Sequence, residues 1–372
     1  MSAGSPETRR KRIAAIVTEY RFNSHADVIL GRLLGDFGYA PAVDVVSIYT
    51  DQVPPADMSR EAAARLDIPI YPTIREAVRA ERSGGPVDGV VIIGEHGSYP
   101  TNDRGQTMYP RRRMLEETLL ALDELGRNVP IFSDKHLSYD FREAQWMYDQ
   151  LKVRGIPFLG GSSIPHTDHV PAYDARLLET VRETLVVSHS PLLEAYGFHA
   201  LEVLQCVHER RRGGETGVKR VAAAQGPGVW AAMDRGEWPE ALLLRALTVY
   251  PDLHLDRHPR ELDPNPILMT VEYADGTVGY VVQFRSLVEQ WAYAFRNAAG
   301  DVAAALCDSE LDRPFGHFER LTRLIEATVT TRRPPFPMER TLLTTGLTCA
   351  VVDSFHGGRP VDTPELGIAY GE

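Results

Sequence analysis

Short apolar runs alternate with helix-like stretches through the first half of the chain. The run Ile13–Val17 predicts a strand, and Ser24 is placed to cap a helix that begins at His25. Five further apolar runs predict strands at Val43–Tyr49, Pro69–Tyr71, Val87–Ile93, Val129–Ser133 and Ile156–Leu159. Strands that alternate with helices are typical of a doubly wound parallel sheet.

The second half has a different pattern. Apolar residues recur at helical spacing in Glu194–Arg212, and two more helices are predicted at His317–Thr328 and Leu342–Ser354. Strands are predicted at Val218–Ala224, Ile267–Tyr273 and Thr277–Phe284, the last two joined by a tight turn. This half therefore predicts an α+β domain with an open antiparallel sheet.

Composition sets the limits of these predictions. The chain has 372 residues, of which 43% are hydrophobic and 24% charged, so we expect two globular domains. These are a Rossmann-like domain over residues 12–160 and the α+β domain over 161–372, after a disordered tail at 1–11. The net charge of −11 argues against nucleic-acid binding, and no apolar run is long enough to span a membrane. Three scattered cysteines and a polar N-terminus favour a cytoplasmic protein.

Three segments resemble one known family. They are Gly197–Glu202 (GFHALE), Asp134–His136 (DKH) and Glu339–Ser354 (ERTLLTTGLTCAVVDS). Together they resemble the glucose-fructose oxidoreductase and inositol dehydrogenase (Gfo/Idh/MocA) family, over most of the chain. The resemblance implies the same two-domain fold, a small-molecule substrate and a homo-oligomer formed through the C-terminal sheet.

The resemblance also implies roles for single residues. Lys135 would contact a substrate hydroxyl or carbonyl, and His199 would act as acid or base, although Ala195 stands where the family has the aspartate partner of this histidine. Glu202 is three residues after His199, so it would share a helix face with it. Asp51 lies close to the place where the family holds the cofactor ribose, which would make it an NAD(P)-binding residue.

The turn after the first strand departs from the family. Its GxGxxG glycines, which let backbone amides approach a dinucleotide diphosphate, align with Val17, Glu19 and Phe22, while His25 matches the family's histidine. A carboxylate at Glu19 would repel the phosphates. We therefore expect an altered or lost cofactor site.

A long polar connection follows the fourth predicted strand. Gly94–Arg113 is rich in Gly, Pro, Tyr and Arg, and it should overhang the ligand crevice because it leaves the carboxyl end of a central strand. Predicted substrate contacts in this loop are Glu95, Tyr99, Asn102 and Arg111. At least two of the arginines at 111–113 are better explained as a solvated charge run.

Imidazoles and carboxylates are expected to converge on the crevice from separate loops. A divalent Zn, Mn or Fe ion could be held there by Glu19, His25, His96 and His136. Our leading hypothesis is therefore a metal-dependent lyase, isomerase or hydrolase that uses no NAD, with Lys135, His199 and Glu202 as catalytic residues. Two alternatives stay open: an NAD(P)-dependent oxidoreductase of a sugar, cyclitol or related alcohol, and a non-catalytic sensor or partner subunit.

Overall fold

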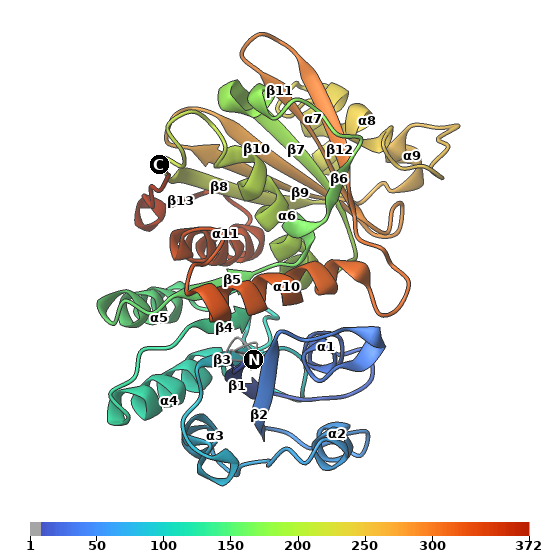
Figure 1. The fold of residues 1–372 in the computed structure, drawn as a ribbon. Helices are drawn as coiled ribbons and strands as arrows, with labels where there is room; N and C mark the ends of the chain where they lie inside the picture. The colour runs from blue at the N-terminus through green and yellow to red at the C-terminus, as the bar shows by residue number, and fades with distance from the viewer. Residues whose placement is uncertain (1–8, 372) are drawn as a thin grey trace, which may run out of the picture.

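The computed structural model describes residues 9–371, which form two domains stacked one above the other (Figure 1). Residues 1–8 of the predicted tail lie outside the described residues. The first strand begins at Lys11. No helix within 9–371 is long and apolar enough to cross a membrane.

The first domain contains a five-stranded parallel sheet in the order β2-β1-β3-β4-β5. Its strands are β1 Lys11–Val17, β2 Val43–Thr50, β3 Gly89–Ile93, β4 Ile131–Asp134 and β5 Phe158–Gly161. β3 is buried along its whole length, as expected for a strand covered on both faces. The predicted strand Pro69–Tyr71 does not form, since this segment makes only an isolated bridge from Ile70 to Ile48.

Helices cover both faces of this sheet. One face packs on α3 Ile74–Arg79, α4 Arg111–Glu124 and α5 Phe141–Val153. The other packs on a short helical segment, Ala26–Leu30 continuing into α1 Gly31–Leu33, and on α10 Gly316–Thr331 from the far end of the chain. The small helix α2, Ser59–Arg65, lies beside β2. The C-terminal half thus supplies part of the wall of the first domain.

The second domain is built on an eight-stranded, mostly antiparallel sheet in the order β13-β8-β9-β10-β7-β11-β12-β6. Its strands are β6 Asp168–Val170, β7 Val181–His189, β8 Val218–Gln225, β9 Ile267–Tyr273, β10 Val278–Phe284, β11 Trp291–Asn297, β12 Val302–Asp308 and β13 Val361–Asp362. Only β10 and β7 pair in parallel. The predicted two-domain fold class is therefore confirmed.

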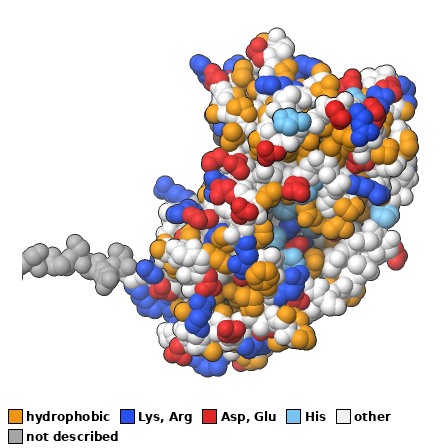
Figure 2. Space-filling model, turned by 90° about the vertical axis from the view of Figure 1, so that its right-hand side faces the viewer, with side chains coloured by type: hydrophobic (Ala, Val, Ile, Leu, Met, Phe, Trp, Pro, Cys, Tyr) orange, Lys and Arg blue, Asp and Glu red, His pale blue; other side chains and the backbone are white. Residues whose placement is uncertain are grey.

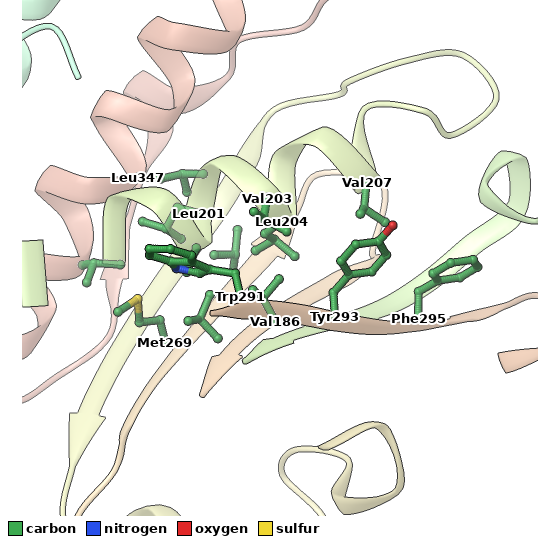
Figure 3. Packing of buried hydrophobic residues seen from close by; sticks show 14 of the residues in the cluster. Val186, Leu201, Val203, Leu204, Val207, Met269, Trp291, Tyr293, Phe295 and Leu347 are labelled. Atoms are coloured by element: carbon green, nitrogen blue, oxygen red, sulfur yellow. The ribbon is translucent and has the colours of Figure 1, made fainter. Parts of the chain in front are cut away.

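Each face of the second sheet has its own apolar core. The inner face packs on α6 Leu193–His208 and α11 Met338–Gly357, as the cluster of Leu201, Leu204, Met269 and Leu347 shows (Figure 3). The outer face is covered at one end by α7 Pro227–Asp234 and α8 Glu240–Leu247, with α9 Pro259–Leu262 nearby. Because α6 is packed between the sheet and the first domain, its N-terminal half lies at the junction of the two domains (Figure 1).

Candidate functional site

A cavity of about 780 Å³ lies between the two domains, at the carboxyl ends of the first sheet's strands. Figure 2 shows a hollow at this junction with histidine side chains in it. The first domain contributes His25, Glu95, His96, Lys135 and His136 to its lining. The second contributes His189, Glu194, His199, Trp291, His317 and Phe318. Ligands of open α/β folds bind at this edge of the sheet, so the cavity is the candidate site.

Lys135 and His199 meet across the domain junction. Lys135 Nζ lies 2.7 Å from His199 Nε2, and the two side chains come from the end of β4 and from α6. On its other side His199 Nδ1 lies 2.6 Å from Ser162 Oγ. Burial, and then the charge of Lys135, lower the pKa of His199 well below its usual value, so the ring is neutral. We assign its proton to Nδ1, which donates to Ser162, because Nε2 accepts from the Lys135 ammonium.

Several residues of the cavity wall have left-handed backbone conformations, among them Lys135 and His96. Lys135 has φ +66° and His96 has φ +69°, and each follows closely on the end of a parallel strand. Non-glycine residues in this region carry a conformational cost that persists only where the surroundings hold them. Both turns place a polar side chain in the cavity lining directly after a buried strand.

The carboxylate of Glu95 balances the positive charges of Arg111 and Lys135 in the cavity wall. This carboxylate receives a 2.7 Å hydrogen bond from Arg111 Nη2 and lies 3.9 Å from Lys135 Nζ. Burial alone would raise the pKa of Glu95, but the positive charges of Lys135 and Arg111 outweigh it and hold the pKa far below its usual range. Arg111 is only 1% exposed and also donates to the backbone oxygen of Gly94. Arg111 lines the cavity, and its guanidinium is bonded to Gly94, Glu95 and His136.

His25 is held by a buried carboxylate. Its Nδ1 lies 2.6 Å from Asp134 Oδ2, and Asp134 is 2% exposed. Edge-on contacts with His96 and Phe318, with ring centroids 5.3 and 4.9 Å away, fix the plane of the imidazole. The helix begins at Ala26 with His25 at its N-cap, one residue later than predicted, and the Oγ of Ser24 accepts from the Asp27 N–H. The local fold thus aims His25 into the cavity.

His136 and Glu194 close another side of the cavity. His136 Nε2 lies 3.1 Å from Arg111 Nη1 and 3.4 Å from Glu194 Oε1. Burial, and then the charge of Arg111, lower the pKa of His136, so it too is neutral. Gln106 donates to Glu194 Oε1 at 2.7 Å. This contact ties the long loop after β3 to the start of α6.

The structure places the other predicted site residues outside the cavity lining. Glu202 is fully buried, and its Oε2 accepts a 3.1 Å hydrogen bond from the backbone N–H of Ser162. Burial raises the pKa of Glu202. Asn102 bonds within its own loop to Gln106, and Tyr99 bonds to Asp51. Ser162, Asp134, Gln106, Glu194 and His317, which the sequence analysis did not select, belong to the site or support it.

Solved structures with the same architecture include several inositol dehydrogenases. GenD2 of gentamicin A biosynthesis, in complex with NAD, superposes with TM-score 0.61 at 14% identity over 97% of this chain and 99% of that one. A scyllo-inositol dehydrogenase from Lactobacillus casei with bound NAD(H) and scyllo-inositol gives 0.62 at 11% over 95% and 99%. A myo-inositol dehydrogenase from Corynebacterium glutamicum gives 0.59 at 12% over 95% and 99%. No protein-family model and no curated protein matches the sequence.

The chain has the fold of these dehydrogenases. The fold implied by the sequence resemblance is therefore confirmed over nearly the whole chain. Our prediction of a metal-dependent enzyme that uses no NAD was wrong, because the structures that share the fold include proteins with NAD bound.

The predicted metal ligands also have other partners. Glu19 pairs with Arg21 at 2.6 Å, and His96 Nδ1 lies 3.2 Å from the same guanidinium. His25 is held by Asp134, and His136 contacts Arg111. Within residues 9–371, no group of three or more His, Cys, Asp or Glu side chains is arranged to hold a metal ion. The guanidinium groups of Arg21 and Arg111 therefore lie among the residues that we predicted to share one metal ion.

The adenosine end of a dinucleotide does not fit the residues in this conformation. Between β1 and the first helix there is no glycine, and the buried carboxylate of Glu19 stands where bare backbone would meet a diphosphate. Asp51 does lie just after β2, where the ribose would be held, but both its oxygens are engaged. Oδ1 accepts from Tyr49 at 2.6 Å and Arg113 at 2.5 Å, and Oδ2 accepts from Tyr99 at 2.7 Å. A ribose would compete there with Tyr99 and Arg113 for the carboxylate.

Proposed function

We propose that this protein is an oxidoreductase that interconverts an alcohol and a carbonyl group on a sugar, cyclitol or related polyol, with NAD(P) as the cofactor. The observation that carries the proposal is the 2.7 Å contact of Lys135 with His199 in the cavity between the domains. The fold shared with inositol dehydrogenases supports the substrate class. Bound NAD(P) would supply the hydride chemistry, although the adenosine end of the crevice does not fit it in this conformation.

The chain's own residues account for proton movement at the substrate oxygen. The Lys135 ammonium can donate to a carbonyl or hydroxyl oxygen in the cavity while its second N–H is held by His199 Nε2. Passing one proton to Nε2 would leave a neutral amine able to take a hydroxyl proton. In the opposite direction the ammonium would give a proton to the carbonyl oxygen and regain one from Nε2. The Ser162 hydroxyl keeps Nε2 directed at Lys135 by accepting from Nδ1.

The cavity suits a neutral polyhydroxylated ligand. Burial is the first cause of a lowered pKa for His96 and His189, each to about 4, so both are neutral at pH 7. Neutral imidazoles offer one donor and one acceptor each, as hydroxyl groups require. His96 Nε2, His136 Nδ1 and His189 Nε2 are buried and have no hydrogen-bond partner within the described chain. Each could bond a substrate hydroxyl after a small shift of its ring that exposes the atom to the cavity.

Cofactor titration and turnover test the proposal together. Fluorescence titration with NADH and NADPH should show saturable binding of one of them, and myo-inositol, scyllo-inositol or a hexose should reduce the matching oxidised cofactor. Lys135→Met should lower kcat by about 10²–10⁴, the usual contribution of a positioned acid or base. Lys219→Met, at an exposed lysine of β8, is the matched control and should keep full activity. Binding of neither cofactor at millimolar concentration, with no turnover, would refute the proposal.

Assembly through the C-terminal sheet stays a proposal. α7 and α8 cover one end of the outer face, and the other end carries charged residues such as the Glu183–Arg296 pair at 2.6 Å. A homo-oligomer would have to use that end. Light scattering coupled to size exclusion should give a mass of at least twice 41.4 kDa, and Arg296→Glu should reduce it. A monomer mass for the unmodified chain at micromolar concentration would exclude this assembly.

A further inference from the structure

We propose that His25 and Asp134 form a second acid–base pair in the cavity, which binds and accepts the proton of a hydroxyl next to the oxygen held by Lys135. The substrate is then a vicinal diol or an α-hydroxycarbonyl compound rather than a simple alcohol. This inference rests on the proposed function, because it places a polyol in the same cavity and narrows its chemistry.

The geometry of the pair is that of an oriented base. The 2.6 Å contact between His25 Nδ1 and Asp134 Oδ2 requires the Nδ1 proton, because an ionised carboxylate can only accept. Nε2 then carries the lone pair, and no residue in the described chain hydrogen-bonds to it. A buried carboxylate behind an imidazole fixes its tautomer and stabilises the imidazolium that forms when Nε2 takes a proton.

The pair lies beside the Lys135–His199 contact. Asp134 is the last residue of β4 and Lys135 is the next residue, so both groups are fixed by the same strand end. The left-handed backbone at Lys135, with φ +66°, turns the chain immediately after Asp134. Both His25 and Lys135 line the cavity. One strand end thus supports an ammonium donor and, through His25, a neutral acceptor.

The donor Lys135 and the neighbouring acceptor, Nε2 of His25, match two adjacent oxygens of a substrate. A substrate oxygen that becomes or is a carbonyl accepts from Lys135, whereas a neighbouring hydroxyl donates its proton to Nε2 of His25. In that transfer the O–H bond breaks, its electron pair stays on the substrate oxygen as an alkoxide beside the Lys135 ammonium, the N–H bond forms at Nε2, and the positive charge on the ring is met by Asp134. A lone alcohol could satisfy only one of these two groups.

A structural role is the competing explanation. A histidine at the start of a helix that bonds a carboxylate could simply join the first helix to β4. That role needs only Nδ1, whereas the proposed role needs Nε2. Asparagine places an amide near the Nδ1 position and glutamine near the Nε2 position, so the two substitutions separate these roles.

The test compares His25→Asn and His25→Gln with His254→Asn, which alters an exposed histidine outside the cavity lining. Binding of trans-1,2-cyclohexanediol and of cyclohexanol to the full chain is measured by saturation-transfer NMR titration. His25→Asn should weaken diol binding about tenfold, as expected for one lost hydrogen bond in a buried site, and leave cyclohexanol unchanged. His25→Gln should recover part of the diol affinity, and His254→Asn should change neither ligand.

Asp134→Asn gives a second measurement that does not depend on residue 25. An amide at this position no longer stabilises an imidazolium, so it should lower kcat for a diol substrate more than it changes KM. Equal weakening of diol and mono-alcohol by His25→Asn, or no weakening at all, would overturn the inference and leave the proposed function standing. Failure of the unmodified chain to bind any diol would overturn both.

Discussion

Replacing Glu95 with glutamine tests the charge balance under the cavity. Glutamine keeps the shape of the side chain and removes its charge. Glu95 Oε2 accepts from Arg111 at 2.7 Å, and Lys135 Nζ lies 3.9 Å from Oε1. Arg111 and Lys135 are 1% and 5% exposed, so water cannot replace the lost anion. The variant would keep two buried cations without their carboxylate.

The expected cost is large for one substitution. Removing one partner of a buried ion pair typically costs about 3–5 kcal/mol of unfolding free energy, because the remaining charge stays buried and uncompensated. The contact with Lys135 is longer than that with Arg111, so we assign most of this cost to Arg111. A loss of about 3 kcal/mol at pH 7 is the lower bound that we expect.

The effect should depend on pH in a defined direction. The pKa of Glu95 is depressed in the folded chain, so its stabilisation is fully present above the pKa of the unfolded state and lost as the pH falls towards the folded value. The difference between the unmodified chain and Glu95→Gln should be constant from pH 6 to 8. It should shrink progressively below about pH 4.3, where the carboxyl group of the unfolded chain takes up its proton.

Urea unfolding followed by circular dichroism gives the measurement. Glu117→Gln is the matched control, because Glu117 pairs with Arg113 at 3.2 Å between side chains that are 31% and 42% exposed. Such a surface pair contributes about 0–1 kcal/mol. If Glu95→Gln were no less stable than Glu117→Gln at pH 7, the buried charge balance described above would be wrong.

Two further predictions concern the support of His199. Burial raises the pKa of Glu202, so its contribution to stability is full below the pKa of the unfolded state and is lost as the pH rises through the folded value. Glu202→Gln should therefore be at least as stable as the unmodified chain at pH 8 by thermal unfolding, and a lower Tm there would contradict this. Gly161 has φ +112°, and a Cβ on it would lie 2.5 Å from Glu202 Oε2, so Gly161→Ala should cost about 1–3 kcal/mol. Gly84→Ala, at φ +90° with nothing within 4 Å, isolates the backbone contribution, and an equal cost at both sites would show that the contact with Glu202 does not matter.

Local pattern was sufficient for most of the first domain and for part of the second. β3 is an unbroken apolar run, which only a strand buried on both faces explains, and it formed where predicted. β7, Val181–His189, was not predicted although it lies inside the second sheet, because it begins with charged residues that face outward at one end. Pro69–Tyr71 is apolar but too short and too far along the edge of β2 to extend the sheet beyond one bridge.

Site residues could be predicted where a family motif contains them. Pairs that come together only in the folded chain could not be predicted. Lys135 and His199 were selected from their motifs and lie 2.7 Å apart, although 64 residues separate them. His25 and Asp134 are 109 residues apart, and nothing local relates them. The metal site failed because we counted imidazoles and carboxylates while overlooking the guanidinium groups, above all Arg111, that lie among them.

The two halves of the cofactor crevice differ in how readily they could admit a dinucleotide. Asp51 is held by three hydrogen bonds from neighbours at the edge of the crevice, each contributing about 0.5–1.5 kcal/mol or somewhat more to a charged group. A ribose that replaces two of them with its own hydroxyls recovers most of that energy, so this end can open at modest cost. At the phosphate end, the Glu19 carboxylate and Arg21 form a 2.6 Å pair, and Arg21 also contacts His96. A diphosphate could compete for Arg21, but it would leave Glu19 buried and facing like charge. If the chain binds NAD(P) as we propose, the position that the Glu19 side chain takes in the complex sets the affinity.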